Sequence, residues 1–447
     1  MSDSLLVILD NVVAGTLTRL SGGRLRFDYE PSYQEQPGHT PLSLSMPTSV
    51  RSHGNQTVTP WLWGLLPDND AVLARWGREF HVSTSSPFSM LATPIGEDCA
   101  GAVRFAPPDE LDRVLGREGE ISWLTNAKVA QRLRDLREDA TAWLGRSFTG
   151  QFSLAGAQAK TALLLQGKRW GVPSGSIPTT HILKPAIVGF DDHDLNEHLC
   201  LDAARRSGLI VARSRISQFA DETAVVVTRY DRVAGSDGAI MRVHQEDMCQ
   251  ALSVPPARKY QSEGGPTPGQ IARLLRDSMD PRAGEQAVHR FADALIWNWL
   301  IAGTDAHAKN YSVLLSGSQV RFAPLYDIAS ALPYGTHERK LRLAMKIGSS
   351  YEVYPQRNRW PIAARDLGLN PDSLVKRARE LAAGAPDAFS AAARAPEVVR
   401  LKRELPKKLV DLVADRAERC LTVLDAPAAV SSRRSPSARS AAGSPRG

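Results

Sequence analysis

The stretch from residue 286 to residue 327 limits most strongly what this chain can fold into. Apolar residues recur at helical spacing from 286 onward, which predicts an amphipathic helix that ends at Gly303. The polar run 304–310 follows this helix. Two short apolar runs, 311–315 and 320–323, are separated by Ser-Gly-Ser and predict a β-hairpin. The expected order of parts is therefore a helix, a polar loop and a hairpin, followed by an acidic residue.

This order of parts matches the catalytic machinery of kinases. Asp305 and Asn310 fit the pattern D-x-x-x-x-N, and Asp327 follows the hairpin. Phosphoryl transfer needs a carboxylate that accepts the proton of the attacking hydroxyl, a role that suits Asp305. It also needs oxygen ligands that hold Mg²⁺ at the phosphates, a role that suits Asn310 and Asp327. The spacing alone leaves a structural alternative open, in which Asp305 caps a turn and Asp327 caps the next helix.

Two upstream segments predict the phosphate-binding side of a nucleotide site. Lys184 ends an apolar strand, so its ammonium group can reach phosphates while its stem packs on apolar neighbours. Glu197, on the next predicted helix, is its candidate ion-pair partner. The small residues of 153–161, around Lys160, would let backbone N–H groups close on phosphate oxygens. A lysine at a strand end is more often an ordinary surface residue, so this alternative also stays open.

The basic character of the chain is concentrated at its C-terminal end. The net charge is +7, and the segment 426–447 contributes four arginines and no acidic residue. This segment has almost no large apolar residues to bury, and we predict that it is disordered. The remainder is nearly balanced in charge and gives no reason to expect a nucleic-acid-binding protein; only the tail is expected to contact phosphate, and non-specifically.

The sequence also excludes several classes of protein. No apolar run reaches the ~18 residues that a membrane span needs, and the N-terminus lacks the basic region of a secretory signal. A disulfide scaffold or a zinc cluster is not expected, because the four cysteines are scattered: Cys99, Cys200, Cys249 and Cys420. We therefore expect a protein of the reducing cytoplasm that does not associate with membranes.

Changes of pattern along the chain predict an α+β protein with five parts. They are a β-rich N-terminal domain (1–110), a linker with a helix (111–147), a strand-rich region that contains the small-residue loop (148–240), a mainly helical region with the polar loop (241–425), and the disordered basic tail (426–447).

Several segments resemble the HipA family of bacterial serine/threonine kinases, which act as toxins of toxin–antitoxin modules. In the kinase-like part they are SLAGAQAKTALL (153–164), PTTHILK (178–184), NEHLCLDAA (196–204), RYDR (229–232), HQEDMCQAL (244–252), KYQSEGGP (259–266), WLIAGTDAHAKNYSV (299–313) and APLYDIASALP (323–333). In the first part they are PLSLSMP (41–47), LLPDND (65–70) and IGEDCAGAV (95–103), which resemble the small N-terminal domain of the family. The resemblance covers nearly the whole chain up to about residue 425.

The resemblance implies roles for individual residues. Asp305 would be the catalytic base, and Asn310 and Asp327 would be the metal ligands. Ser153 would be a site of autophosphorylation that silences the kinase. The phosphate loop, the strand lysine, a hinge that grips adenine through backbone atoms and the catalytic loop would bind ATP through Ala155, Gly156, Ala157, Gln158, Ala159, Lys160, Lys184, Thr228, Arg229, Tyr230, His307, Ala308, Lys309, Asn310, Tyr326 and Asp327.

Two features depart from common kinase patterns. Thr228 stands where the HipA family often has Glu, although a backbone contact to adenine would survive this change. Gly303 and Thr304 precede Asp305, so the chain has no His-Arg-Asp triplet, which is normal for the family.

The resemblance also implies a fold and a function. We expect a two-lobed protein-kinase-like fold with a small β-rich N-terminal domain and a mainly helical C-terminal lobe. The expected activity is ATP- and Mg²⁺-dependent phosphorylation of a protein serine or threonine in the bacterial cytoplasm, with an aminoacyl-tRNA synthetase of the glutamyl type as substrate. A DNA-binding helix-turn-helix antitoxin of the HipB type would restrain the kinase and hold it at operator DNA. Two alternatives stay open: a non-catalytic, nucleotide-binding co-repressor of the antitoxin, and a small-molecule kinase of related architecture.

Overall fold

The computed structural model describes residues 3–9, 11–116, 119–145, 152–235, 239–356 and 359–425. The basic tail, 426–447, for which the sequence predicts disorder, lies outside the described residues.

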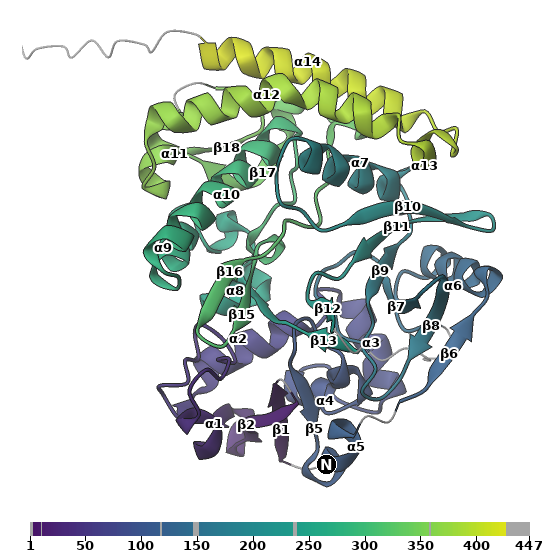
Figure 1. The fold of residues 1–447 in the computed structure, drawn as a ribbon, viewed down its shortest axis with the longest axis vertical. Helices are drawn as coiled ribbons and strands as arrows, with labels where there is room; N and C mark the ends of the chain where they lie inside the picture. Colours follow the sequence, from purple (N-terminus) through teal and green to yellow (C-terminus); the bar gives the residue numbers. More distant parts are fainter. Residues whose placement is uncertain are drawn as a thin grey trace, which may run out of the picture.

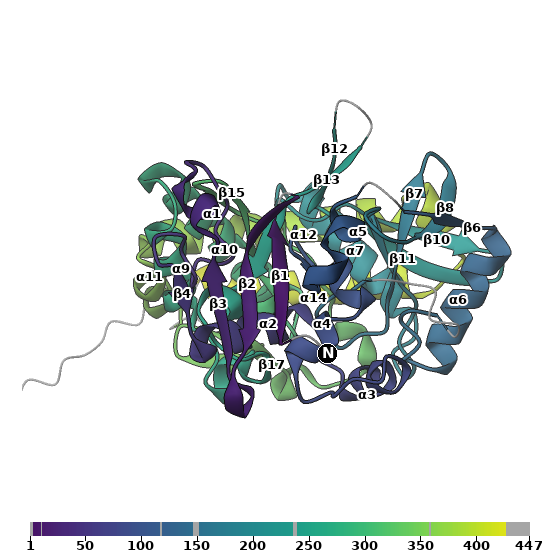
Figure 2. The same ribbon diagram turned by 90° about the horizontal axis from the view of Figure 1, so that it is seen from below.

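A five-stranded antiparallel sheet forms the first part of the fold, with the strand order β4-β3-β2-β1-β5. Its strands β1, β2 and β3 lie side by side in Figure 2. Leu5, Val7 and Leu9 of β1 are buried and share one core with Trp61. The strands are β1 (Ser4–Leu9), β2 (Val12–Arg19), β3 (Leu25–Tyr29), β4 (Ser52–His53) and β5 (Arg104–Ala106). The helices of this part are α1 (Pro31–Glu35), α2 (Asn55–Leu65), α3 (Asp70–Glu79), α4 (Pro87–Leu91) and α5 (Leu111–Leu115).

A six-stranded antiparallel sheet follows, in the order β10-β11-β9-β7-β8-β6. Its strands are β6 (Ile121–Leu124), β7 (Thr161–Gln166), β8 (Arg169–Pro173), β9 (His181–Lys184), β10 (Ser214–Phe219) and β11 (Glu222–Thr228). Helix α6 (Asn126–Glu138) covers it with Val129 and Leu133, which pack on Leu163 and Val226. Helix α7 (His193–Arg206) lies between this sheet and the long helix α12, as Figure 1 shows.

The rest of the chain is mainly helical, as the sequence predicts. Its helices are α8 (Met248–Ala251), α9 (Pro268–Asp277), α10 (Pro281–Leu300), α11 (Trp360–Leu367), α12 (Pro371–Ala393), α13 (Pro396–Val399) and α14 (Leu405–Asp425). Small sheets are formed by β12 (Arg232–Ala234) with β13 (Ile240–Arg242), by β14 (His244–Asp247) with β15 (Ser312–Ser316) and β16 (Gln319–Phe322), and by β17 (Arg342–Ile347) with β18 (Ser350–Glu352). Short 3-10 turns are η1 (Ser21–Gly23), η2 (Pro94–Glu97), η3 (Pro108–Glu110), η4 (Pro256–Arg258), η5 (Gln261–Glu263), η6 (Ala308–Asn310), η7 (Leu332–Tyr334) and η8 (Glu338–Lys340).

The predicted helix before the polar loop is confirmed as α10. Asp280 caps its N-terminus by accepting a hydrogen bond from the backbone N–H of Ala283. After Leu300 the chain turns sharply, and the N–H of Gly303 donates to the carbonyl of Asn298 at 2.7 Å. A Cβ atom at Gly303 would lie 2.4 Å from Oδ1 of Asn298, so only glycine fits here. The start of the polar loop is thereby fixed on the end of α10.

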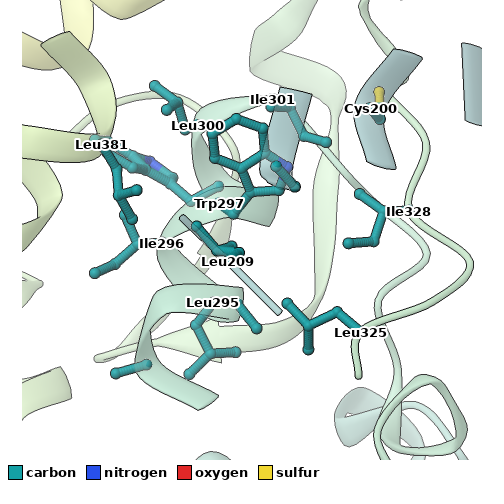
Figure 3. Close-up of a cluster of buried hydrophobic side chains, with 14 of the residues drawn as sticks. Cys200, Leu209, Leu295, Ile296, Trp297, Leu300, Ile301, Leu325, Ile328 and Leu381 are labelled. Atoms are coloured by element: carbon teal, nitrogen blue, oxygen red, sulfur yellow. The ribbon is translucent and has the colours of Figure 1, made fainter. Parts of the chain in front are cut away.

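The largest core surrounds α10. Trp297, Leu300 and Ile301 at the end of this helix belong to one buried cluster with Leu325 and Ile328, and Figure 3 shows these side chains. Because Leu325 and Ile328 flank Asp327 in the sequence, the core holds the acidic residue after the hairpin in place.

Candidate active site

A cavity of about 740 Å³ opens where the N-terminal part, the six-stranded sheet and the helical part meet. It is lined by most of the residues predicted to bind ATP or to act in catalysis, namely Ala155, Gly156, Ala157, Gln158, Lys160, Lys184, Thr228, Arg229, Tyr230, Asp305, His307, Lys309, Asn310, Tyr326 and Asp327. Three predicted residues, Ser153, Ala159 and Ala308, do not line it. The fold thus brings segments that are far apart in the sequence to one cavity.

Lys184 stands at the centre of the charged side chains in this cavity. Its Nζ donates to Oε1 of Glu197 on α7 at 2.8 Å and to Oδ1 of Asp327 at 2.6 Å. Burial alone would lower the pKa of Lys184, but these two carboxylates outweigh it and raise the pKa above the ordinary lysine value. The lysine at the end of β9 is therefore charged, and it is held from two sides, by Glu197 of α7 and by Asp327 after the hairpin.

Asp327 has an unusual backbone conformation. Its φ angle is 57°, in the left-handed region that costs a residue with a side chain about 1 kcal/mol or more. Two residues earlier, the N–H of Leu325 donates to the carbonyl of Ile210 at 2.9 Å, and the carbonyl of Leu325 accepts from the N–H of Ala212 at 2.7 Å. These bonds hold the backbone that leads to Asp327. Burial would raise the pKa of Asp327, yet Lys184 holds it below its usual range. Asp327 is thus an ionised carboxylate in a fixed, strained position.

The loop that carries Asp305 is closed by its own hydrogen bonds. Nδ2 of Asn310 and the backbone N–H of His307 both donate to the carbonyl of Asp305, at 3.0 and 2.9 Å. The carboxylate of Asp305 is exposed to the cavity side, and its Oδ1 accepts a hydrogen bond of 2.6 Å from the hydroxyl of Tyr260. Burial lowers the pKa of His307 to about 4, so this imidazole is neutral. Asp305 is consequently the carboxylate of the loop that is accessible from the cavity, as the predicted role of proton acceptor requires.

Asn310 and Asp327 have the atoms that a Mg²⁺ site requires. Because Nδ2 of Asn310 is used by Asp305, its Oδ1 remains as a ligand atom, and Oδ2 of Asp327 remains beside the Lys184 contact. Carboxylate and amide oxygens are ligands that Mg²⁺ prefers, and it commonly takes only one or two protein side chains together with phosphates. Within the described residues no group of three or more His, Cys, Asp or Glu side chains is placed to hold a metal ion.

The phosphate loop is folded around Lys160. The buried Nζ of Lys160 donates to the carbonyl of Ala155 at 2.6 Å and lies 4.9 Å from the centre of the Trp143 ring. Gly156 has a φ of 103°, and a Cβ atom there would approach Nζ of Lys160 to 2.7 Å. Burial, together with the charge of Lys184, lowers the pKa of Lys160 to about 8. The loop therefore adds a second lysine to the cavity that Lys184 lines.

Ser153 precedes this loop and is completely buried. Its Oγ donates to the carbonyl of Leu65 at 2.8 Å, and its N–H donates to the carbonyl of Asp98 at 3.0 Å. Both partners belong to the N-terminal part. The autophosphorylation predicted for Ser153 therefore stays a prediction that requires this serine to leave its present position.

The predicted hinge is only in part free to contact a base. The N–H of Thr228 donates to the carbonyl of Arg213 at 2.8 Å, and the N–H of Arg229 donates to that of Thr180 at 2.9 Å. Among the described residues, the N–H of Tyr230 has no such partner. Of the three predicted hinge residues, Tyr230 is thus the one whose N–H is available for the predicted contact to adenine.

The side chain of Arg229 belongs to a buried cluster of ion pairs. It bonds to Asp231 at 2.8 Å, and Arg232 bonds to Asp98 at 2.8 Å, all nearly inaccessible to solvent. The N–H of Gly101 donates to Asp231 at 2.7 Å and completes the link to the N-terminal part. Because this cluster pairs buried charges of both signs across the two parts, it links the predicted hinge to the N-terminal part.

Tyr326 connects the hinge with the catalytic loop. Its hydroxyl donates to the carbonyl of Lys309 at 2.6 Å and lies 2.7 Å from Oγ of Ser312. Its ring is 5.7 Å from the ring of Tyr230. Tyr326 thus lines the cavity next to Tyr230 of the predicted hinge.

Three residues that line the cavity were not predicted as site residues from the sequence: Asp68, Lys259 and Tyr260. Asp68 contacts Lys259 at 2.9 Å and also contacts Lys309, and Tyr260 contacts Asp305. These residues lie in the runs LLPDND (65–70) and KYQSEGGP (259–266), so the resemblance of these runs to the HipA family was the available sequence signal.

No helix within the described ranges is both long and apolar enough to cross a membrane.

Comparisons with known proteins agree with this arrangement. Residues 5–106 match the family model of the HipA N-terminal domain, and residues 152–389 match that of the HipA-like C-terminal domain. A protein of Sinorhizobium fredii that is named as a kinase, Y4mE, is 32% identical over 375 residues, which are 83% of this chain and 87% of that protein. The serine/threonine-protein kinase toxin HipA of Shewanella oneidensis is 29% identical over 325 residues, which are 68% of this chain and 70% of the toxin.

A solved structure shows the fold to be shared. The structure of HipA of Shewanella oneidensis with HipB and its operator DNA matches with a TM-score of 0.80 at 24% identity, and covers 94% of this chain and 98% of the matched chain. This similarity confirms the fold class expected from the sequence, a two-lobed kinase-like α+β fold with a β-rich N-terminal part.

Proposed function

The chain belongs to the HipA family of serine/threonine kinase toxins, and we propose that it is an ATP- and Mg²⁺-dependent kinase that phosphorylates a serine or threonine of a protein. The observation that carries this proposal is the pairing of Lys184 with both Glu197 and Asp327. In protein kinases a strand lysine paired with a helix glutamate holds the phosphates of ATP, and the aspartate after the catalytic loop binds the metal.

The residues of the cavity divide the work of phosphoryl transfer. Lys184, Lys160 and the backbone of the phosphate loop would hold the phosphates of ATP. Asn310 and Asp327 would hold Mg²⁺, which when bound neutralises phosphate charge that develops during transfer. Asp305, through the oxygen that Tyr260 leaves free, would orient the substrate hydroxyl and accept its proton. The neutral His307 would line the nucleotide without competing for that proton.

Ser153 would silence the enzyme when phosphorylated. Its hydroxyl fills a site without solvent between the carbonyl of Leu65 and the backbone of Asp98. A phosphate carries a charge of about −1.5 to −2, which a buried site lined by carbonyl oxygens disfavours. Phosphorylation at this position would therefore expel the phosphate loop from the cavity and remove Lys160 from the nucleotide.

The proposed setting is a toxin–antitoxin module in the bacterial cytoplasm. The family resemblance supports an aminoacyl-tRNA synthetase, of the glutamyl type, as the protein substrate. The structure of the Shewanella oneidensis protein with HipB and operator DNA supports a HipB-like helix-turn-helix antitoxin and its operator as partners.

Transfer of labelled phosphate from ATP to protein tests the proposed activity. Asp305→Asn is expected to lower kcat by about 100-fold or more at an unchanged melting temperature, because general-base catalysis of this kind contributes about 10²–10⁴-fold. Asp277→Asn, an exposed aspartate of α9, is the matched control. Undiminished transfer by Asp305→Asn would contradict the proposal.

Expression without antitoxin separates the kinase from the non-catalytic co-repressor. Only the kinase is expected to arrest growth, and Asp327→Asn should relieve the arrest. New phosphoserine or phosphothreonine sites on proteins after induction distinguish a protein kinase from a small-molecule kinase.

A further inference from the structure

Asp68 lies outside the kinase-like sheets, in the loop between α2 and α3 of the N-terminal part, and yet it lines the cavity. Its backbone N–H donates to the carbonyl of Gly156 at 3.1 Å, and Pro67 pairs with Gly156 as a parallel β-bridge. The neighbouring Asn69 donates from Nδ2 to the carbonyl of Ala157 at 3.4 Å. This loop therefore holds the phosphate loop at Gly156 and Ala157, through its backbone and through the side chain of Asn69.

The side chain of Asp68 holds a different segment. Its Oδ1 accepts a hydrogen bond from Nζ of Lys309, and its Oδ2 accepts one of 2.9 Å from Nζ of Lys259. Lys309 precedes Asn310 in the catalytic loop. The carbonyl of Lys259 in turn accepts a hydrogen bond of 3.2 Å from the N–H of Ala308 in the same loop. One carboxylate thus joins the catalytic loop and the segment packed on it.

Burial makes these contacts matter for the geometry of the site. The side chains of Asp68 and Lys309 are 10% and 2% exposed. Burial would raise the pKa of Asp68, but the ammonium groups of Lys309 and Lys259 outweigh it and hold the pKa below its usual range. Because breaking a buried pair leaves an uncompensated charge, moving either lysine away from Asp68 would be energetically costly.

We infer that Asp68 is a positioning residue of the phosphotransfer reaction, by which the N-terminal part aligns the phosphate loop with the catalytic loop. Asp68 touches neither the transferred phosphate nor the acceptor hydroxyl in this role. It acts through Gly156 on one side and Lys309 on the other, so that both loops move as one unit. This role rests on the proposed kinase function, since alignment has a catalytic effect only if the cavity transfers phosphate.

Asp68→Asn in the full chain tests this role in two ways. We expect kcat for phosphate transfer to fall about 10- to 100-fold, since misplacement by about 1 Å can cost about 100-fold. The KM for ATP should change much less, because the hinge contacts of the base are untouched. Hydrogen–deuterium exchange should show faster exchange at 152–160 and at 304–311 together. Asp70→Asn, at an exposed aspartate two positions away at the start of α3, should match the wild type in both measurements.

A folded Asp68→Asn protein with wild-type kcat, or with faster exchange in only one of the two loops, would overturn the role of Asp68. If Asp68→Asn does not fold, Asp68→Glu keeps the charge but lengthens the side chain by one methylene. It should still lower kcat several-fold, and a wild-type rate would then overturn the role. If the wild type itself transfers no phosphate, the kinase proposal fails, while the exchange of the two loops still decides whether Asp68 couples them.

Discussion

The hydroxyl of Tyr260 donates a hydrogen bond of 2.6 Å to Oδ1 of Asp305. Burial raises the pKa of Tyr260, and the Asp305 carboxylate adds to this effect, so the phenol remains a donor throughout the physiological pH range. The Tyr260 ring also meets the ring of His307 edge to face, with 5.0 Å between the centroids. Tyr260 therefore fixes one oxygen of Asp305 and leaves the other free for the proposed contact with the acceptor hydroxyl.

Tyr260→Phe is expected to lower kcat about 10-fold and to change the KM for ATP by less than about twofold. The variant keeps the ring against His307 and removes only a hydrogen bond to a charged group, which is typically worth about 1.5–3 kcal/mol. Steady-state phosphate transfer measures both constants. Tyr354→Phe, outside the cavity, is the control.

A double-mutant cycle decides whether Tyr260 acts through Asp305. If it does, Tyr260→Phe should have little further effect on the residual rate of Asp305→Asn. An equal loss in both backgrounds, or an unchanged kcat in the single variant, would contradict the role of the hydrogen bond.

Variants of the central ion pair are expected to differ in severity. Lys184→Met should lower kcat/KM by about 1,000-fold, because it removes the group proposed to contact the phosphates and leaves Glu197 and Asp327 as facing carboxyl groups. Glu197→Gln should cost about 10- to 100-fold, because Asp327 still holds the lysine. Kinetics of labelled-phosphate transfer, with melting temperatures as the folding check, measure the order. A Glu197→Gln enzyme as impaired as Lys184→Met would show that the helix glutamate does more than hold the lysine.

The elements around the site could be predicted because their signals are local. The helical spacing before Gly303 gave α10, the Ser-Gly-Ser turn gave the hairpin of β15 and β16, and the apolar run that ends at Lys184 gave β9. The ion pair predicted between Lys184 and Glu197 is present, because a strand and the next helix have few ways to pack.

Contacts across the chain could not be predicted in this way. Asp68 and Lys309 are 241 positions apart, and Asp98 and Arg229 are 131 positions apart. No periodicity in one sequence links such residues, since their pairing depends on how distant parts of the chain are placed against each other. For the same reason the sequence placed Ser153 near the phosphates but could not predict that it is buried against Leu65.

Nucleotide binding should weaken as the pH rises from 7 to 9. Burial and Lys184 lower the pKa of Lys160 to about 8, so its ammonium group is charged below this pH and neutral above it. Only the charged form attracts phosphates, and the affinity for ADP should therefore fall several-fold across this range. Calorimetry at pH 7, 8 and 9 measures this change.

Lys160→Met should weaken ADP binding at pH 7 and flatten the dependence on pH. Lys168→Met, an exposed lysine in the turn between β7 and β8, is the matched control and should follow the wild type. A Lys160→Met protein whose affinity falls with pH as steeply as that of the wild type would show that another group titrates.

The stability of the whole chain should depend on Asp98. This carboxylate contacts Arg232 at 2.8 Å, Arg229 at 3.4 Å and Arg242 at 3.5 Å, and it is buried. Asp98→Asn leaves these guanidinium groups with Asp231 as the one remaining acid of the cluster within the described residues. The free energy of unfolding should fall by about 3 kcal/mol or more, because breaking a buried ion pair leaves an uncompensated charge.

Acid should reveal the same interaction in the wild type. Burial would raise the pKa of Asp98, but the arginines outweigh it and lower the pKa below the ordinary 3.8. A depressed carboxyl pKa stabilises the folded state above the unfolded value, and this contribution is lost as the pH falls below it. Urea unfolding at pH 7 and at pH 3 should therefore show that the free energy of unfolding falls less between these pH values for Asp98→Asn than for the wild type. The exposed Asp109→Asn is the control and should match the wild type at both pH values. Equal losses in all three proteins would contradict this prediction, because they would show that the ionised Asp98 adds nothing to the stability of the folded state at neutral pH.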